Sequence, residues 1–173
     1  MASKRYIYWA GACLVWIAGV HAVRSMEVSE LDDQISWSLV AAISEIESGY
    51  DASAIGSHGE RGLMQIKRAT WDAVAPKVYG RRLPFQKAFE PADNLRVGRA
   101  YLHELASFLS EHSEAWNGDP LELLIAAYNT GPSRLLQVGF SLEECSPATQ
   151  SYVRRVQAVL KEMLYEDQAF LSE

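Results

Sequence analysis

The sequence predicts an all-α fold, or nearly so, for its 173 residues. Apolar residues recur at the spacing of one helix face in several segments. Two segments open with a polar residue followed by proline, at Asp119-Pro120 and at Ser146-Pro147, which is a typical helix start. No segment alternates apolar and polar residues for long enough to predict a strand, although a small irregular β element is expected in the loop before Gly62.

The first predicted helix carries its apolar residues from Ile35 to Ile46, and Gly49 ends it. A loop follows over 51–59, then a short helix over 70–78 and a proline-containing connection over 79–92. The segment 93–112 is expected to be the longest helix. The next helix starts at Pro120 and stops before Gly131-Pro132, and the last starts at Pro147.

The N-terminus has the features of an export signal. Lys4 and Arg5 precede an apolar run over Tyr6–Val20, and a cleavage point follows Ala22. We therefore expect residues 1–22 to be a signal peptide and residues 23–173 to form a single exported domain. The alternative is an uncleaved membrane anchor over Tyr6–Val23, which is just long enough to span a bilayer.

Charge and side-chain spacing argue against several functions. The formal net charge of −6 does not suit nucleic-acid binding, which needs a basic face. Histidines 58, 103 and 112 form no ligand cluster, so no metal is expected, and no cofactor motif is present. If Cys13 is removed with the leader, Cys145 is left alone and is expected to be a packing residue.

The most informative residue is Glu47, within Ile46-Glu47-Ser48-Gly49-Tyr50. It ends an apolar helix, where nonpolar neighbours can surround its side chain. Desolvation disfavours the anion, so a glutamate in such a place keeps its proton near neutral pH. A protonated glutamate in a cleft is the acid that cleavage of a glycosidic bond requires.

Four blocks of the sequence resemble the soluble, lysozyme-like lytic transglycosylases. They are Glu47-Ser48, Gly62-Leu63-Met64-Gln65, Ala127-Tyr128-Asn129-Thr130-Gly131-Pro132 and Tyr152-Val153. Each block alone is common, but their order and spacing match the family. The resemblance extends from about Leu39 to about Leu160 and implies the lysozyme-like fold.

The resemblance also implies a reaction and a substrate. Glu47 would first act as an acid on the β-1,4 bond between N-acetylmuramic acid and N-acetylglucosamine in peptidoglycan. It would then act as a base on the C6 hydroxyl of the muramic sugar, which attacks the anomeric carbon. The product is a 1,6-anhydro sugar, and no water is consumed.

The same resemblance implies roles for the surrounding side chains. Tyr128 would lie beside Glu47 and orient it, and Tyr152 would be a second aromatic residue at the cleft. Ser48 would give a supporting hydrogen bond, and Met64 and Gln65 would form the cleft wall, with an apolar surface and an amide for the sugar. The expected substrate-binding residues are Ser48, Ser57, Met64, Gln65, Tyr128, Asn129 and Tyr152.

Three departures from the family pattern concern the loop after Glu47. The place of a usual serine is taken by Gly56, so that Ser57 is displaced by one residue, and Glu60 stands where alanine is usual. Glu60 is either a second carboxylate in the cleft, which supports charge or positions water, or a solvated residue paired with Arg61. Lys67-Arg68 replaces an apolar-proline pair and is expected to change only the start of the next helix.

The sequence therefore favours a peptidoglycan lytic transglycosylase. One alternative is a muramidase that uses Glu60 to activate water. Another is a wall-binding or assembly module that keeps the fold without turnover. By analogy alone, a protein of this size suits local wall remodelling for an envelope-spanning secretion or conjugation complex.

Overall fold

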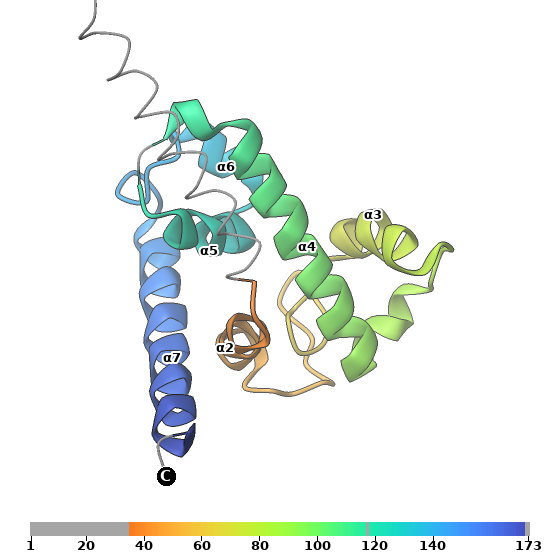
Figure 1. Cartoon of the computed structure of the whole chain (residues 1–173). Coiled ribbons are helices and arrows are strands. Elements are labelled where there is room, and N and C mark those ends of the chain that lie inside the picture. The colour runs from red at the N-terminus through yellow and green to blue at the C-terminus, as the bar shows by residue number, and fades with distance from the viewer. Residues whose placement is uncertain (1–34, 117, 172–173) are drawn as a thin grey trace, which may run out of the picture.

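The computed structural model describes residues 35–116 and 118–171. Within these residues the chain forms α-helices and short 3₁₀ helices joined by loops (Figure 1), which confirms the all-α prediction. The predicted signal peptide, residues 1–22, lies outside the described residues. The helices are α2 (Trp37–Ser48), α3 (Arg68–Tyr79), η1 (Phe85–Phe89), α4 (Pro91–Glu111), η2 (Ser113–Ala115), α5 (Pro120–Thr130), α6 (Pro132–Gln137) and α7 (Pro147–Leu171).

The ends of α2 are fixed by local hydrogen bonds. At its start, Oγ of Ser36 accepts a hydrogen bond from the backbone N–H of Leu39 at 3.2 Å, which satisfies a donor that has no partner in the helix. At its end, Gly49 adopts the left-handed conformation with φ of 60°, the usual helix C-terminus. Glu47 therefore lies in the last turn of α2, as predicted.

The central feature of the fold is the packing of α2 between long helices. α7 packs against α2 and α5, and α4 packs against α2, α3 and α5. Figure 1 shows α7 on one side of α2 and α4 on the other. The largest fully buried side chains form one core and come from α2 and the residue Ile35 before it, the loop after α2, α3, α4 and α5: Ile35, Leu39, Ile43, Met64, Trp71, Leu102, Leu105, Leu109, Leu123, Leu124 and Ile125.

The loop after α2 contains the small β element expected before Gly62. Arg61 forms isolated antiparallel bridges with Ile55 on one side and Ile66 on the other. Buried Asn94 of α4 holds this loop: its Oδ1 accepts from the N–H of Met64 at 2.8 Å, and its Nδ2 donates to the carbonyls of Arg61 and Ala88. The loop is thus fixed to the core on the side away from solvent.

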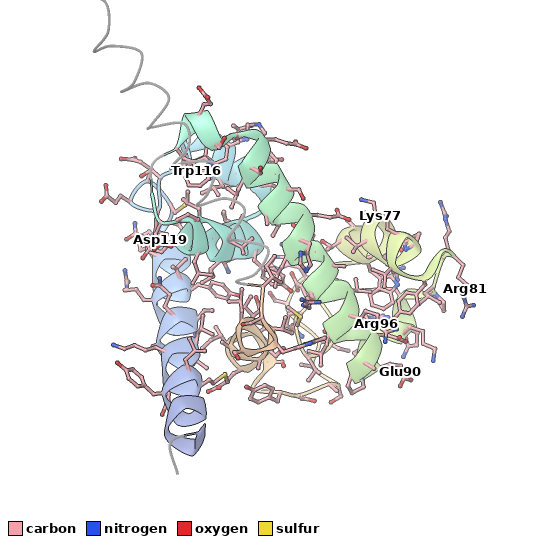
Figure 2. All side chains as sticks on the ribbon, viewed as in Figure 1. Lys77, Arg81, Glu90, Arg96, Trp116 and Asp119 are labelled. Carbon is pink, nitrogen blue, oxygen red and sulfur yellow. The ribbon has the colours of Figure 1, made fainter. Side chains whose placement is uncertain are left out.

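The segment from α3 to the first turn of α4 forms a lobe on the far side of α4 from α7. Figure 2 shows Lys77, Arg81 and Glu90 on this lobe, and Arg96 on the following turn of α4. Nε1 of Trp71 donates to the carbonyl of Leu83 at 3.0 Å, which holds the connection between α3 and η1 against α3. The chain enters this lobe from the loop after α2, called the bridged loop below because it contains the bridges of Arg61. The start of α3 therefore has a defined position beside that loop.

Several predicted boundaries need correction. Among the described residues the longest helix is α7, with 25 residues, and α4 has 21. The connection 79–92 contains η1, and α4 starts at Pro91. Gly131-Pro132 ends α5 as predicted, but Pro132 also starts α6, because the fixed φ of proline suits the first position of a helix.

Two further predictions concern Cys145 and the membrane. Cys145 is a buried free cysteine, as expected for a packing residue. Among the described residues, no helix combines the length and apolar character needed to cross a bilayer.

Candidate active site

Glu47 lies where α2 meets α7, and its carboxyl group is half-buried. The hydroxyl of Tyr152, on α7, donates a hydrogen bond to Oε1 of Glu47 at 2.8 Å. Tyr152 is itself only 4% exposed. Because a buried tyrosine has little freedom, this bond fixes the orientation of the carboxyl group.

The surroundings of Glu47 favour its protonated form. Burial raises the pKa of Glu47 above its ordinary value, although the hydrogen bond from Tyr152 opposes this rise. The negative charge of Glu60 raises the pKa further, and the positive charges of Lys67 and Arg155 lower it. The net direction is upward, as an acid that must donate a proton near neutral pH requires.

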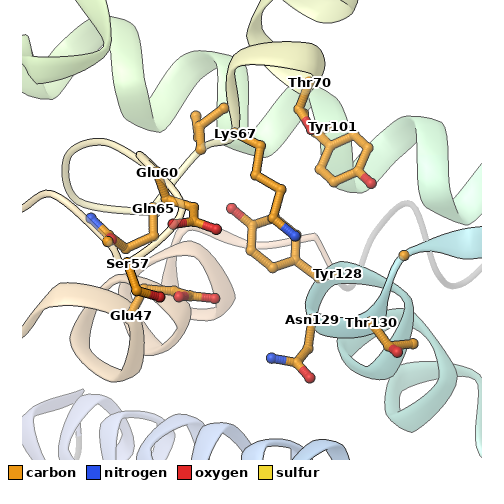
Figure 3. A pocket seen from close by; sticks show the side chains of 13 residues that line it. Glu47, Ser57, Glu60, Gln65, Lys67, Thr70, Tyr101, Tyr128, Asn129 and Thr130 are labelled. Carbon is orange, nitrogen blue, oxygen red and sulfur yellow. The ribbon is translucent and has the colours of Figure 1, made fainter.

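A pocket opens in front of Glu47 (Figure 3). Figure 3 shows Glu47 from α2, Glu60 and Gln65 from the bridged loop, and Tyr128 from α5 around the same space. The residues that line it are Glu47, Gly56, Ser57, Glu60, Gln65, Ile66, Lys67, Thr70, Tyr101, Tyr128, Asn129, Thr130 and Gly131. Of the expected site residues, the fold therefore brings Ser57, Glu60, Gln65, Tyr128 and Asn129 together with Glu47.

Gln65 occupies a strained position in the bridged loop. Its φ is 45°, in a region that residues other than glycine rarely adopt. Its Nε2 donates to the carbonyls of Ala54 at 3.2 Å and Gly62 at 2.9 Å. These bonds use its donors, so Oε1 remains as an acceptor at the pocket.

The position of Tyr128 differs from the expected one in its hydrogen bond. Its hydroxyl donates to the carbonyl of Met64 at 2.8 Å, and its ring packs against that of Tyr101 with centroids 5.7 Å apart. The hydroxyl bonded to Glu47 belongs to Tyr152 instead. Tyr128 thus lies beside Glu47, as expected, and the charge of Glu47 acts on it. Its hydroxyl holds the loop, whereas the hydroxyl of Tyr152 holds the carboxyl group.

Three expected substrate contacts do not line the pocket: Tyr152, which bonds to Glu47 from behind it, Met64 and Ser48. Met64 is 0% exposed and its side chain packs on Gly98 in the core, because its backbone is held inward by Asn94. Ser48 donates from Oγ to the carbonyl of Leu63 at 2.8 Å, so its hydroxyl ties α2 to the loop. Both residues support the site from behind and do not line it.

Glu60 lies at the pocket and is not paired with Arg61. Its side chain is 13% exposed, and its Oε1 is 3.7 Å from Nδ1 of His58. The guanidinium of Arg61 lies instead over the rings of Phe85 and Phe89, at 4.4 Å and 4.9 Å. The interpretation of Glu60 as a solvated partner of Arg61 is therefore wrong, because Arg61 points away into the aromatic side of the loop.

Lys67 is the main pocket residue that the sequence analysis missed. It was expected only to alter the start of α3, yet its side chain lines the pocket and its charge acts on Glu47 and Glu60. Its departure from the family pattern was the available signal. Thr70 and Tyr101 also line the pocket, and nothing in their spacing indicated this.

No metal site is found among the described residues, since no three histidine, cysteine, aspartate or glutamate side chains there gather closely enough to hold an ion. Chemically, the pocket offers one acid with a raised pKa, a second carboxylate and a cation. Amide and hydroxyl groups surround them. This set suits proton transfer to a polar, uncharged substrate such as a sugar.

The family of the chain follows from its sequence as well as from this site. The family model of the transglycosylase SLT domain matches residues 25–141. The fold and site define a helical, lysozyme-like domain with a half-buried acid at a pocket, and the chain belongs to the transglycosylase SLT domain family.

Several known proteins are similar to this chain. Membrane-bound lytic murein transglycosylase F of Histophilus somni (strain 2336) is 31% identical over 104 residues, which are 60% of this chain and 19% of that protein. The enzyme of the same name from Yersinia pestis (strain Pestoides F) is 31% identical over 102 residues, which are 59% of this chain and 19% of that protein. The chain thus spans about a fifth of the length of these relatives.

A solved structure is similar over more of the chain. It is the X-ray structure of an inactive glutamate-to-glutamine mutant of the lytic transglycosylase Slt from Pseudomonas aeruginosa. It superposes with a TM-score of 0.59 at 25% identity, over 81% of this chain and 23% of that protein.

Proposed function

We propose that this chain is a peptidoglycan lytic transglycosylase. It would cleave the β-1,4 bond between N-acetylmuramic acid and N-acetylglucosamine and leave 1,6-anhydromuramic acid ends. The observation that carries the proposal is the carboxyl group of Glu47, which is half-buried at a pocket and held by Tyr152, with a raised pKa. The family and the names of the similar proteins support it.

In the first step, Glu47 acts as a general acid. Its proton passes to the glycosidic oxygen, and the bond between that oxygen and the anomeric carbon of the muramic sugar breaks. The N-acetylglucosamine end leaves as an alcohol. Positive charge develops on the muramic sugar, whose own acetamido group stabilises it, as the family resemblance implies. One protein carboxyl group is then enough where two are usual.

In the second step, the same carboxylate acts as a base. It takes the proton from the C6 hydroxyl of the muramic sugar, and the C6 oxygen forms a new bond to the anomeric carbon. Glu47 is thereby protonated again and ready for the next bond. The bond from Tyr152 suits both steps, because a tyrosine O–H can stabilise the carboxylate that exists between them.

The polar residues of the pocket suit a sugar chain. Oε1 of Gln65 and the side chain of Asn129 offer hydrogen-bonding groups to hydroxyls and acetamido groups. Ser57 offers a hydroxyl, and the exposed part of Tyr128 offers an aromatic surface. We therefore propose that these residues bind the glycan around Glu47, while Ser48 and Met64 support them.

A second candidate function has one observation in its favour. Glu60 lines the pocket together with Glu47, and its pKa is held below its ordinary value, although burial alone would raise it. Backbone N–H groups and the charges of His58 and Lys67 account for the lowering. An ionised carboxylate there suits a muramidase, in which it would activate a water molecule.

Replacing Glu47 tests the catalytic role. Glu47→Gln keeps the shape and an acceptor for Tyr152 but removes the transferable proton. Release of glycan fragments from purified sacculi should fall by at least about 10²-fold. The control is Glu45→Gln on the exposed face of the same helix, which should keep activity. Near-normal release by Glu47→Gln would refute the proposal, and no release by the unaltered chain would favour a wall-binding module.

The place of action is proposed to be the periplasm, with cleavage of the leader after Ala22. The similar proteins from Histophilus somni and Yersinia pestis are named membrane-bound. Mass spectrometry of the exported protein should show an N-terminus at Val23 in the soluble periplasmic fraction. An intact N-terminus in the membrane fraction would favour an anchor. Service to an envelope-spanning secretion or conjugation complex is a further proposal, which in-cell cross-linking at exposed positions would test.

A further inference from the structure

Gly56 and the side chain of Glu60 occupy neighbouring space at the rim of the pocket. The N–H of Gly56 donates to the backbone carbonyl of Glu60 at 2.9 Å, and the N–H of Gly59 donates to the carbonyl of Gly56 at 3.0 Å. These bonds close the chain between the two residues into a tight turn. Both residues line the pocket that contains Glu47.

There is no room for a side chain at position 56. A Cβ atom added to Gly56 would collide with Oε2 of Glu60 and would lie 2.7 Å from Oε1 of Gln65. Gln65 cannot easily move, because its amide is bonded to two backbone carbonyls. The backbone of Gly56 does not adopt a positive φ, so the requirement for glycine there is one of space.

The carboxylate of Glu60 is fixed in the space that Gly56 leaves. Its Oε2 accepts a hydrogen bond from the N–H of His58 at 3.0 Å, and only 13% of the side chain is exposed. A carboxylate that accepts a backbone N–H is held more firmly than a free surface acid. The negative charge therefore has a defined place at the pocket wall.

The charge of Glu60 reaches Glu47 across the pocket. The groups that act on Glu47 are Glu60, Lys67, Arg155 and the hydroxyl of Tyr152. Among these, Glu60 alone favours the protonated form of Glu47 through its charge, while the other three favour the carboxylate. Removal of Glu60 would leave the two cations and Tyr152 unopposed except by burial.

We propose, on the basis of the function proposed above, that Gly56 and Glu60 act as one unit. The absence of a side chain at position 56 leaves space for the Glu60 carboxylate at the pocket wall. There Glu60 acts as a positioning residue that keeps the proton on Glu47. The two departures from the family pattern, at positions 56 and 60, are then one change. A larger residue at position 56 would expel the carboxylate, and a shorter residue at position 60 would remove the closest of the contacts that exclude a side chain at position 56.

A double-mutant cycle tests this unit. The variants are Gly56→Ser, Glu60→Ala and the double variant, compared in thermal stability and in the pH dependence of anhydro-product release from sacculi. Gly56→Ser alone should lower Tm by about 5 °C, since overpacking costs about 1–3 kcal/mol and each kcal/mol is worth about 2–4 °C at this size. In the Glu60→Ala background the same serine should lower Tm by clearly less, because the colliding carboxylate is gone and the close approach to Oε1 of Gln65 remains.

The pH dependence of activity is the measurement that a purely structural role of Glu60 would leave unchanged. Glu60→Ala and Glu60→Gln should both shift the alkaline limb of the pH–rate profile downward, because the raised proton affinity of Glu47 is partly lost. Gly56→Ser should shift it in the same direction. The double variant should have the same activity and pH–rate profile as Glu60→Ala, and the two single losses should not multiply.

The controls separate this unit from the proposed function. Gly118→Ser introduces a side chain where the nearest atom to the new Cβ is 3.7 Å away, and neither Tm nor the profile should change. Additive effects on Tm, or an unchanged alkaline limb in Glu60→Gln, would overturn the inference.

If Gly56→Ser does not fold alone, its recovery in the Glu60→Ala background supports the unit, and continued failure there contradicts it. Absence of glycan release by the unaltered chain would overturn the function instead, and the cycle in Tm would remain valid.

Discussion

Tyr152 donates a hydrogen bond from its hydroxyl to Oε1 of Glu47 at 2.8 Å, although the two residues are 105 positions apart in the sequence. The bond joins the last turn of α2 to the first turns of α7. Burial raises the pKa of Tyr152 well above its ordinary value, and the charge of Glu47 raises it further. Tyr152 thus keeps its proton at the pH values where the site works and always acts as the donor.

Tyr152→Phe should weaken the site in two measurable ways. Loss of the hydrogen bond leaves Glu47 free to rotate, so turnover should fall, by up to about 10²-fold if the carboxyl moves by 1 Å. The same bond lowers the pKa of Glu47, so its removal should move the alkaline limb of the pH–rate profile upward. Tyr165→Phe, at an exposed position of α7, should change neither. A profile that moved downward would contradict this role of Tyr152.

Glu47→Gln should make the folded state less sensitive to pH. Because the pKa of Glu47 is raised in the folded protein, the folded state holds this proton more tightly than the unfolded state does. Stability is therefore lost as the pH rises from the ordinary glutamate pKa, about 4.3, through the raised value. Urea unfolding should show Glu47→Gln equal to the unaltered chain near pH 4 and more stable at neutral pH. Equal stability at both pH values would mean that Glu47 is ionised at no cost, and the opposite trend would mean that the folded state favours its carboxylate.

Lys67→Gln should act on Glu47 in the direction opposite to a change at Glu60. The charge of Lys67 lowers the pKa of Glu47 from the pocket wall. Its removal should move the alkaline limb of the pH–rate profile upward, and the effect should shrink at high salt. Lys87→Gln, on η1 outside the pocket, is the matched control. An unchanged limb in Lys67→Gln would show that solvent screens this charge.

Asn94 should prove essential for the bridged loop. It is 0% exposed and makes hydrogen bonds to the backbone of Met64, Arg61 and Ala88. Asn94→Ala leaves these groups unpaired, and each costs about 1–3 kcal/mol, so urea unfolding should show a loss of at least about 3 kcal/mol. Asn129→Ala, at an exposed position, should cost far less. A loss below about 1 kcal/mol would mean that water replaces the amide.

Much of the fold could be predicted because its signals are local. The end of α2 and the start of α5 were predicted from Gly49 and Asp119, whose backbone or side chain acts within a few residues. The start of α6 was missed because Gly131-Pro132 suits both the end of one helix and the beginning of another. The length of α7 was underestimated because nothing local ends it, and its extent depends on packing against α2 and α5.

The site was harder to predict, since its geometry depends on contacts between distant segments. The motifs indicated which residues gather, but not that Tyr152, rather than Tyr128, bonds to Glu47. Met64 was expected at the cleft because its motif is functional, whereas its side chain faces the core at Gly98. The roles of Asn94 and Lys67 depend on tertiary contacts that no spacing in the sequence displays.

The most direct test of the central claim is the mass of the products that the unaltered chain releases from purified sacculi. If Glu47 acts first as acid and then as base on the C6 hydroxyl, the muropeptides should carry 1,6-anhydromuramic acid ends, which are 18 Da lighter than the hydrolysed forms because no water is added. They should also lack reducing muramic ends. Products with reducing ends would contradict the transglycosylase reaction and show that the chain is a hydrolase, which adds water.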